Sequence, residues 1–161
     1  MIRIGFGFDS HRFEAGTNKP LVLCGVKVPH DRHLVAHSDG DAPIHALIDA
    51  MFGAAGVGDI GEHFPDTNPK FANAESTRLL TEAMTMLAEM GWIVVNADVT
   101  IVAEAPRLET HKFPMRLRLA DLLGLDTSMV SVKAKTAEGL GPLGAGDGLA
   151  AYAVVLLEEM K

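Results

Sequence analysis

Hydrophobic and polar residues alternate at a period of two in some parts of the chain and repeat at helical spacing in others. From Ile2 to Phe8, isoleucine and phenylalanine alternate with arginine and glycine, which predicts a half-buried strand. Runs of apolar or β-branched residues predict further strands at residues 21–28, 92–103, 130–136 and 149–157, the last with a helix as the alternative. Helical spacing predicts helices at residues 41–55 and 74–90 and a third helix that ends at Gly124.

These elements predict an α+β fold in one domain, residues 1–161. Their order is typical of a two-layer domain with a mixed four-stranded sheet, three helices on one face and a small hairpin. The polar residues 30–33 predict an exposed turn. Because 48% of the residues are hydrophobic, apolar side chains remain on both sides of the strands, and self-association is an economical way to cover the free face.

Charge and composition narrow the classes of partner. The formal net charge of −7 argues against binding to nucleic acid or to an anionic membrane, since both need a basic face. An anionic ligand would therefore have to be held by cations or backbone amides. The single cysteine, Cys24, and the lack of an apolar leader or of a long apolar run predict a cytoplasmic protein.

Residues 37–49 concentrate two histidines and three aspartates at the point where a polar loop becomes a helix. Pro43 is tolerated in the first turn of a helix, and Asp41 can accept hydrogen bonds from its free amides. His45 then projects from the first turn toward a loop rich in carboxylates, as metal-binding histidines often do. The alternative is a capped helix with solvated aspartates.

A second polar pair follows the first strand. Asp9 and His11 are two residues apart, so in extended backbone they point to the same face. Together with His45 they provide one oxygen and two nitrogens, the ligand set of a catalytic zinc site with an open fourth position. Glu138, beside a glycine-rich loop, could hold a harder cation such as Mg²⁺. Either feature alone is also typical of an ordinary strand end or a flexible loop.

Five motifs in consistent order resemble one family. They are Gly7-Phe8-Asp9-Ser10-His11; His37-Ser38-Asp39-Gly40-Asp41 with His45; Gly58-Asp59-Ile60-Gly61 with Phe64-Pro65-Asp66-Thr67; Ala103-Glu104-Ala105-Pro106; and Lys133-Ala134-Lys135-Thr136 with Glu138. Over nearly the whole chain, this pattern resembles the 2-C-methyl-D-erythritol 2,4-cyclodiphosphate synthase family of the non-mevalonate isoprenoid pathway. Glu104 and Arg107 stand where that family commonly has glutamine and lysine.

The resemblance implies a lyase that acts as a homotrimer with active sites between neighbouring subunits. Its substrate would be a cytidine diphosphate compound, 4-diphosphocytidyl-2-C-methyl-D-erythritol 2-phosphate. The 2-phosphate would attack the β-phosphorus, closing a cyclic diphosphate and expelling CMP. Such a reaction needs neutralised charge and aligned groups more than it needs a general base.

The resemblance also implies roles for individual residues. Zn²⁺ would be bound by Asp9, His11 and His45, and Mg²⁺ or Mn²⁺ by Glu138, while His37 and Thr136 would stabilise the transition state. The residues implied to contact the phosphates and the methylerythritol unit are Asp9, Ser10, His11, His37, Ser38, Asp59, Ile60, Gly61, Phe64, Pro65, Asp66, Thr67 and Asn68. Those implied to hold the cytidine from a neighbouring subunit are Ala103, Glu104, Ala105, Pro106, Arg107, Leu108, Glu109, Lys135, Thr136, Ala137 and Glu138.

Two other functions use the same residues. A zinc hydrolase would use the cluster to activate water, releasing phosphate without a cyclic product. A trimeric binding module would use the metal only to stabilise its fold. The order of the motifs favours the synthase over both.

Overall fold

A mixed five-stranded sheet forms one layer of the molecule in a computed structural model that describes residues 1–161. The strand order is β4-β1-β7-β5-β6, and only β5 and β6 run parallel. The strands are β1 (Ile2–Ala15), β4 (Arg32–Leu34), β5 (Trp92–Val102), β6 (Val130–Lys135) and β7 (Gly148–Glu159). The predicted α+β class is confirmed, but the predicted count of four strands is wrong.

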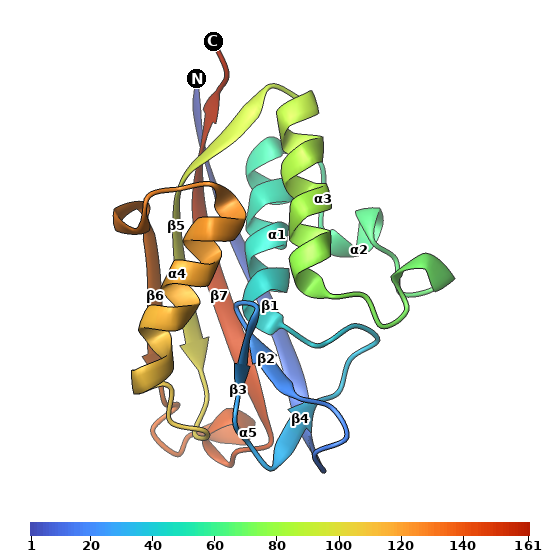
Figure 1. Cartoon of the computed structure of the whole chain (residues 1–161), viewed down its shortest axis with the longest axis vertical. Helices are drawn as coiled ribbons and strands as arrows, with labels where there is room; N and C mark the ends of the chain where they lie inside the picture. The colour runs from blue at the N-terminus through green and yellow to red at the C-terminus, as the bar shows by residue number, and fades with distance from the viewer.

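Three long helices cover one face of this sheet (Figure 1). They are α1 (Ala42–Ala55), α3 (Ser76–Glu89) and α4 (Lys112–Leu123). Short helical turns occupy the connections: α2 (Ile60–His63), η1 (Pro69–Phe71), η2 (Glu109–His111), η3 (Thr127–Met129) and α5 (Gly141–Gly144). The core lies between the sheet and α1, whose inward side chains are almost fully buried. None of the helices has the length and apolar content needed to cross a bilayer.

The fifth strand comes from the segment predicted to be an exposed turn. Residues Arg32–Leu34 pair with the end of β1, and His33 is buried at this edge. The His33 ring lies against the chain, with its Nδ1 3.2 Å from the carbonyl oxygen of Gly16. His33 is therefore buried although the segment is polar, because the strand pairs with the end of β1 and the His33 ring contacts the carbonyl oxygen of Gly16.

The predicted strand at residues 21–28 is instead a hairpin of β2 (Leu21–Leu23) and β3 (Val26–Val28). Cys24 and Gly25 between them both have positive φ, 54° and 72°, as the tight primed turn of a two-residue hairpin requires. The carboxylate of Asp41 accepts hydrogen bonds from both turn amides, at 2.8 and 2.6 Å. The same carboxylate caps α1 through the Ile44 amide, so one buried side chain joins the hairpin to the helix.

Strand β1 and helix α1 approach each other through glycines. A Cβ atom on Gly5 would lie 1.8 Å from the carbonyl oxygen of Ala50, and one on Gly7 would lie 1.9 Å from that of Ala46. The side of β1 that faces the helix therefore has no room for side chains at these two positions. The predicted strand with alternating apolar residues and glycines is confirmed. Within one chain, the side that carries Gly5 and Gly7 is the buried side.

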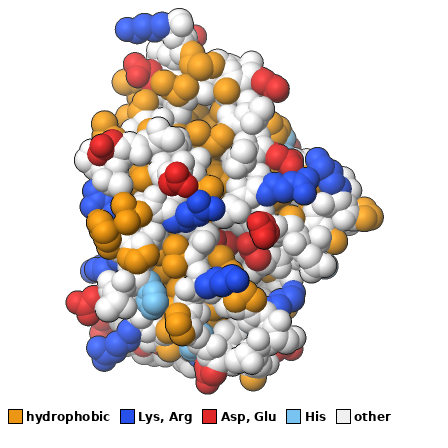
Figure 2. All heavy atoms as spheres, in the orientation of Figure 1, with side chains coloured by type: hydrophobic (Ala, Val, Ile, Leu, Met, Phe, Trp, Pro, Cys, Tyr) orange, Lys and Arg blue, Asp and Glu red, His pale blue; other side chains and the backbone are white.

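The opposite side of β1 carries large apolar side chains that the chain itself leaves exposed. We call this surface the open face, defined by Ile2, Ile4, Phe6, Phe8 and Tyr152. Ile4 is 71% exposed and Phe6 63% exposed, and the Phe6 and Phe8 rings lie 6.2 and 5.2 Å from that of Tyr152. On the helix-bearing face, by contrast, Figure 2 shows charged side chains of both signs scattered among apolar ones.

Candidate active site

Asp9, His11 and His45 come together at the junction of β1 and α1. Asp9 Oδ2 lies 2.8 Å from His11 Nε2 and 3.0 Å from His45 Nδ1, and the two nitrogens are 3.4 Å apart. Asp9 and His11 point inward on the same face of β1 as Gly5 and Gly7, and His45 lies in the first turn of α1. The close packing of strand on helix thus brings the three side chains to one point.

The chemistry of this group fits a divalent metal ion. Zinc bonds of about 2.0–2.1 Å at tetrahedral angles place ligand atoms about 3.3 Å from one another, close to the spacing found here. The ligand atoms of these three residues all lie within 4.8 Å of one another, close enough to hold one metal ion. Three protein ligands leave one coordination position for a substrate or water.

Electrostatics at the cluster favour a charged carboxylate. Burial by itself would raise the pKa of Asp9, but the hydrogen bonds and charges of His11 and His45 outweigh it and lower that pKa to about 2. Burial by itself would lower the pKa of His11, but the hydrogen bond and charge of Asp9, together with the contact to Val35 and the charge of Asp66, outweigh it and raise that pKa. The Nδ1–H of His11 donates to the carbonyl oxygen of Val35 at 3.1 Å, which leaves Nε2 free to bind a metal.

A cavity of about 520 Å³ opens over the cluster. Eight residues that the sequence implied as substrate contacts line it: Asp9, His11, His37, Ser38, Ile60, Gly61, Phe64 and Asp66. Its remaining lining is the ligand His45 and four apolar residues not foreseen from the sequence, Val35, Ala36, Phe71 and Leu79. The cavity therefore combines an apolar wall with a polar, metal-binding end.

The other residues implied to contact the phosphates and the methylerythritol unit do not line this cavity. Asp59 caps α2 in a capping box with Glu62, and Asn68 caps η1. Pro65 and Thr67 belong to the same connection but do not line the cavity. Ser10 lines a different hollow next to Arg12 and Arg32. The connection between α1 and α3 thus contains short helical turns with their own caps.

A second cavity, also of about 520 Å³, lies at the β6 edge of the sheet. It is lined by the implied cytidine residues Ala103, Glu104, Pro106, Arg107, Leu108, Glu109, Lys135 and Thr136, together with Lys112 and Ala134. Of these, Lys112 was not foreseen, because at the start of a helix it has the sequence signature of an ordinary surface lysine. Three cationic side chains, Arg107, Lys112 and Lys135, line this cavity together with the acidic Glu104 and Glu109, so it offers cations to a phosphate despite the net negative charge of the chain.

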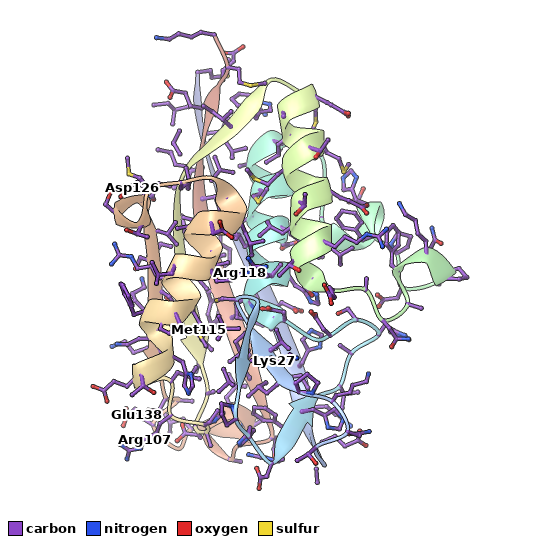
Figure 3. The ribbon with its side chains drawn as sticks, viewed as in Figure 1. Lys27, Arg107, Met115, Arg118, Asp126 and Glu138 are labelled. Atoms are coloured by element: carbon purple, nitrogen blue, oxygen red, sulfur yellow. The ribbon has the colours of Figure 1, made fainter.

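Three residues implied at this second site, Ala105, Ala137 and Glu138, do not line the cavity but border its loop. Thr136 Oγ1 donates to Glu138 Oε1 at 2.8 Å, and Glu104 Oε1 accepts from the Ala137 amide at 2.8 Å. Glu104 therefore braces the loop, a task that the carbonyl oxygen of a glutamine would perform equally. In Figure 3, the labelled residues Arg107 and Glu138 lie at the same end of the molecule.

The two cavities are far apart within one chain. Along the paired registers, Asp9 lies opposite Ala151, Ala151 opposite Ile101, and Ile101 opposite Ala134. Three strand spacings of about 4.8 Å put Asp9 roughly 14 Å from Ala134, and no residue lines both cavities. A single chain does not join Glu138 to the metal cluster.

One residue that contacts the cluster from behind was not foreseen from the sequence. Ser76, at the start of α3, places its Oγ 2.8 Å from His45 Nε2, and Ser76 is in turn bonded to Asp39. The expected carboxylate behind His45 is therefore present but acts through a serine. A serine at the start of a helical pattern is ordinarily a capping residue, so its sequence position carries no signal for this contact.

Comparisons with known proteins match the chain over almost its full length. Residues 2–158 match the model of the YgbB family. A relative from Nitrosococcus oceani named 2-C-methyl-D-erythritol 2,4-cyclodiphosphate synthase is 51% identical over 158 residues, which cover 98% of this chain and 99% of the relative.

Solved structures give the same result. The bifunctional IspDF from Campylobacter jejuni superposes with a TM-score of 0.94 at 43% identity, covering all of this chain and 43% of that longer chain. A 2C-methyl-D-erythritol-2,4-cyclodiphosphate synthase in a form with bound CDP superposes with a TM-score of 0.88 at 40% identity, covering 97% of this chain and all of that one.

Proposed function

The chain belongs to the YgbB family, and we propose that its substrate lies over Asp9, His11 and His45 of one subunit and reaches the second cavity of a neighbouring subunit. The enzyme is a lyase of isoprenoid precursor synthesis that produces 2-C-methyl-D-erythritol 2,4-cyclodiphosphate. The observation that carries the proposal is the metal-binding geometry of these three side chains at the end of a cavity.

The reaction converts 4-diphosphocytidyl-2-C-methyl-D-erythritol 2-phosphate into the cyclic diphosphate and CMP. An oxygen of the 2-phosphate forms a bond to the β-phosphorus, and the bond from that phosphorus to the bridging oxygen of CMP breaks. The attacking phosphate is already ionised, so no side chain has to remove a proton. Alignment of two groups on one molecule can contribute about 7–11 kcal/mol toward the barrier.

We assign the residues of the first cavity to the reacting phosphates and the methylerythritol unit. A divalent cation, Zn²⁺ in this proposal, supplies positive charge beside the diphosphate when bound by Asp9, His11 and His45. His37 and Ser38 line the cavity next to this cluster, where they can donate hydrogen bonds to phosphate oxygens. The apolar wall that includes Phe64 suits the methyl-bearing carbon chain of the substrate.

We assign the second cavity to the cytidine and its phosphate. Arg107, Lys112 and Lys135 line it, so an anionic nucleotide would meet positive charge. Thr136 lines it and Glu138 stands at its border, where Glu138 is proposed to hold Mg²⁺ or Mn²⁺ and Thr136 to stabilise the transition state. CDP in a related solved structure supports a cytidine ligand for this chain.

A homotrimer explains how the two cavities meet. The open face is a continuous apolar surface that a monomer would leave in water, which is typical of an interface between subunits. Three copies packed around an axis through their open faces would place the β4–β1 side of one sheet beside the β6 edge of the next. We propose that each active site joins the metal cluster of one subunit to Glu138 and Thr136 of its neighbour.

Turnover of the cytidylated substrate tests the proposed site. Purified protein with Zn²⁺ and Mg²⁺ is mixed with the substrate and followed by phosphorus NMR, with CMP and the cyclic diphosphate expected in equal amounts. His45→Ala should lower the rate by about 100-fold or more, because it removes a metal ligand. His30→Gln is the matched control, since His30 lies outside both cavities and should leave the rate unchanged.

Other products would point to other functions. Release of inorganic phosphate without a cyclic product would indicate a zinc hydrolase. Full activity of His45→Ala would contradict the metal site, and an unchanged Mg²⁺ requirement in Glu138→Ala would contradict the role of Glu138.

A further inference from the structure

The second ring nitrogen of each histidine in the cluster has a different kind of partner. His11 donates its Nδ1–H directly to a backbone carbonyl, that of Val35. His45 instead presents Nε2 to a hydroxyl, Ser76 Oγ, at 2.8 Å; Ser38 Oγ is more distant at 3.3 Å. A hydroxyl can either donate or accept, so by itself it does not determine which nitrogen of His45 carries the proton.

The carboxylate of Asp39 removes this ambiguity. Ser76 Oγ donates its only hydrogen to Asp39 Oδ1, and the Ser76 amide donates to Asp39 Oδ2 at 3.0 Å. Because the Ser76 hydroxyl already donates its hydrogen to Asp39, it can only accept a hydrogen bond from His45. Nε2 of His45 therefore carries a proton whether the ring is charged or neutral, and in the neutral form that binds a metal the lone pair of Nδ1 points toward Asp9 and His11.

The surroundings hold this arrangement in place. Ser76 is fully buried in the first turn of α3, and the amide of Asp41, just before α1, also donates to Asp39 Oδ1. The Asp39 carboxylate thus ties the starts of two helices together. One of these helices presents His45 and the other presents the hydroxyl that contacts it, so the ring cannot turn without breaking buried hydrogen bonds.

We propose that Asp39 and Ser76 are positioning residues that set the proton location and orientation of His45 for metal binding, with Asp39 acting only through Ser76. This inference rests on the metal site of the proposed function. Loss of such a partner typically weakens metal affinity by about 10–100-fold. Because the two residues act in series, their effects on affinity should not multiply.

The affinity of the full-length protein for Zn²⁺, measured by competition with a chromophoric chelator, tests the proposal. Ser76→Ala and Asp39→Asn should each raise the dissociation constant by about 10–100-fold. The double variant should bind within about threefold of Ser76→Ala alone, as expected for groups acting in series. Thr77→Ala is the control, because it alters the neighbouring residue of the same helical turn and should bind Zn²⁺ as the wild type does.

Two further readouts separate positioning from a loss of fold. Melting temperatures of the metal-free proteins report on the fold, and the visible spectrum of the Co²⁺-loaded proteins reports on the ligand geometry. The spectrum should change in Ser76→Ala and Asp39→Asn and stay unchanged in Thr77→Ala. Wild-type affinity in both single variants, or losses that multiply in the double variant, would overturn the positioning role alone. A wild-type protein that binds no Zn²⁺ would overturn the proposed metal site and this inference with it.

Discussion

At the residue scale, Asp41 connects more of the structure than any local pattern indicated. Its carboxylate accepts hydrogen bonds from the amides of Cys24, Gly25 and Ile44, so it caps α1 and closes the β2–β3 turn together. Burial raises the pKa of Asp41 to about 7, although the amides of Gly25 and Cys24 act in the opposite direction. This carboxyl group is therefore an internal structural group, where the sequence predicted only a helix cap.

Replacing Asp41 by alanine should lower the free energy of unfolding by about 2–4 kcal/mol, because it leaves three amides without their acceptor. Urea unfolding with a metal chelator present measures this effect without a contribution from bound metal. Asp126→Ala is the matched control, since Asp126 caps η3 through Ser128 at the surface and should cost no more than about 1 kcal/mol. Equal losses in the two variants would show that the buried contacts of Asp41 add nothing to an ordinary cap.

At the element scale, the contact between β1 and α1 decides where the candidate ligands meet. Gly5 and Gly7 let the helix backbone lie against the strand, and Asp9 and His11 continue the same side of β1 toward His45. Any side chain at the glycine positions would have to push the helix outward. The glycines therefore shape the metal cluster although they contact no metal ligand themselves.

Gly7→Ala should destabilise the protein by about 1–3 kcal/mol or more, since its methyl group would overlap the carbonyl oxygen of Ala46. The folded fraction should also bind Zn²⁺ more weakly, because the strand and helix are forced apart. Chemical unfolding and chelator competition measure the two effects. Gly53→Ala is the control within α1: no atom approaches its Cβ closer than 4.0 Å, so it should stabilise the helix slightly. Wild-type stability of Gly7→Ala would contradict the close approach.

At the scale of the whole molecule, the open face and the separated cavities both point to a shared assembly. The chain leaves Ile4, Phe6 and Phe8 in water on the sheet face opposite the helices. Its two cavities lie near opposite edges of that sheet, with two strands, β7 and β5, between β1 and β6. Association through the open face would bury these apolar side chains and bring the two kinds of cavity together between neighbouring subunits.

Phe6→Asp should convert a trimer into monomers at micromolar concentration, because it places like charges and an unpaired polar group within an apolar interface. Sedimentation velocity measures the change, and turnover should be lost with it. Leu117→Asp provides the comparison: it puts the same charge on an exposed apolar residue of α4, in the helix layer, and should leave the assembly intact. A wild-type monomer, or a trimer that survives Phe6→Asp, would contradict assembly through the open face.

Local sequence determined much of this protein. Alternation and helical spacing predicted most of the strands and all three long helices, and they placed Asp9 and His11 on one side of a strand and His45 in the first turn of a helix. These features could be predicted because backbone periodicity and helix capping depend on residues close together in the chain. The family resemblance, carried by the motifs along the chain, is confirmed by the comparisons.

Only the tertiary structure decided how those elements meet. The alternation of β1 did not reveal that its glycine side is buried, because that depends on a helix some forty residues later in the sequence. Residues 21–28 form a hairpin because their turn amides bind Asp41, which lies later in the chain. Ser76 contacts His45 only because α3 packs behind α1. In each case the deciding contact joins distant segments, and periodicity within one segment carries no information about its distant partner.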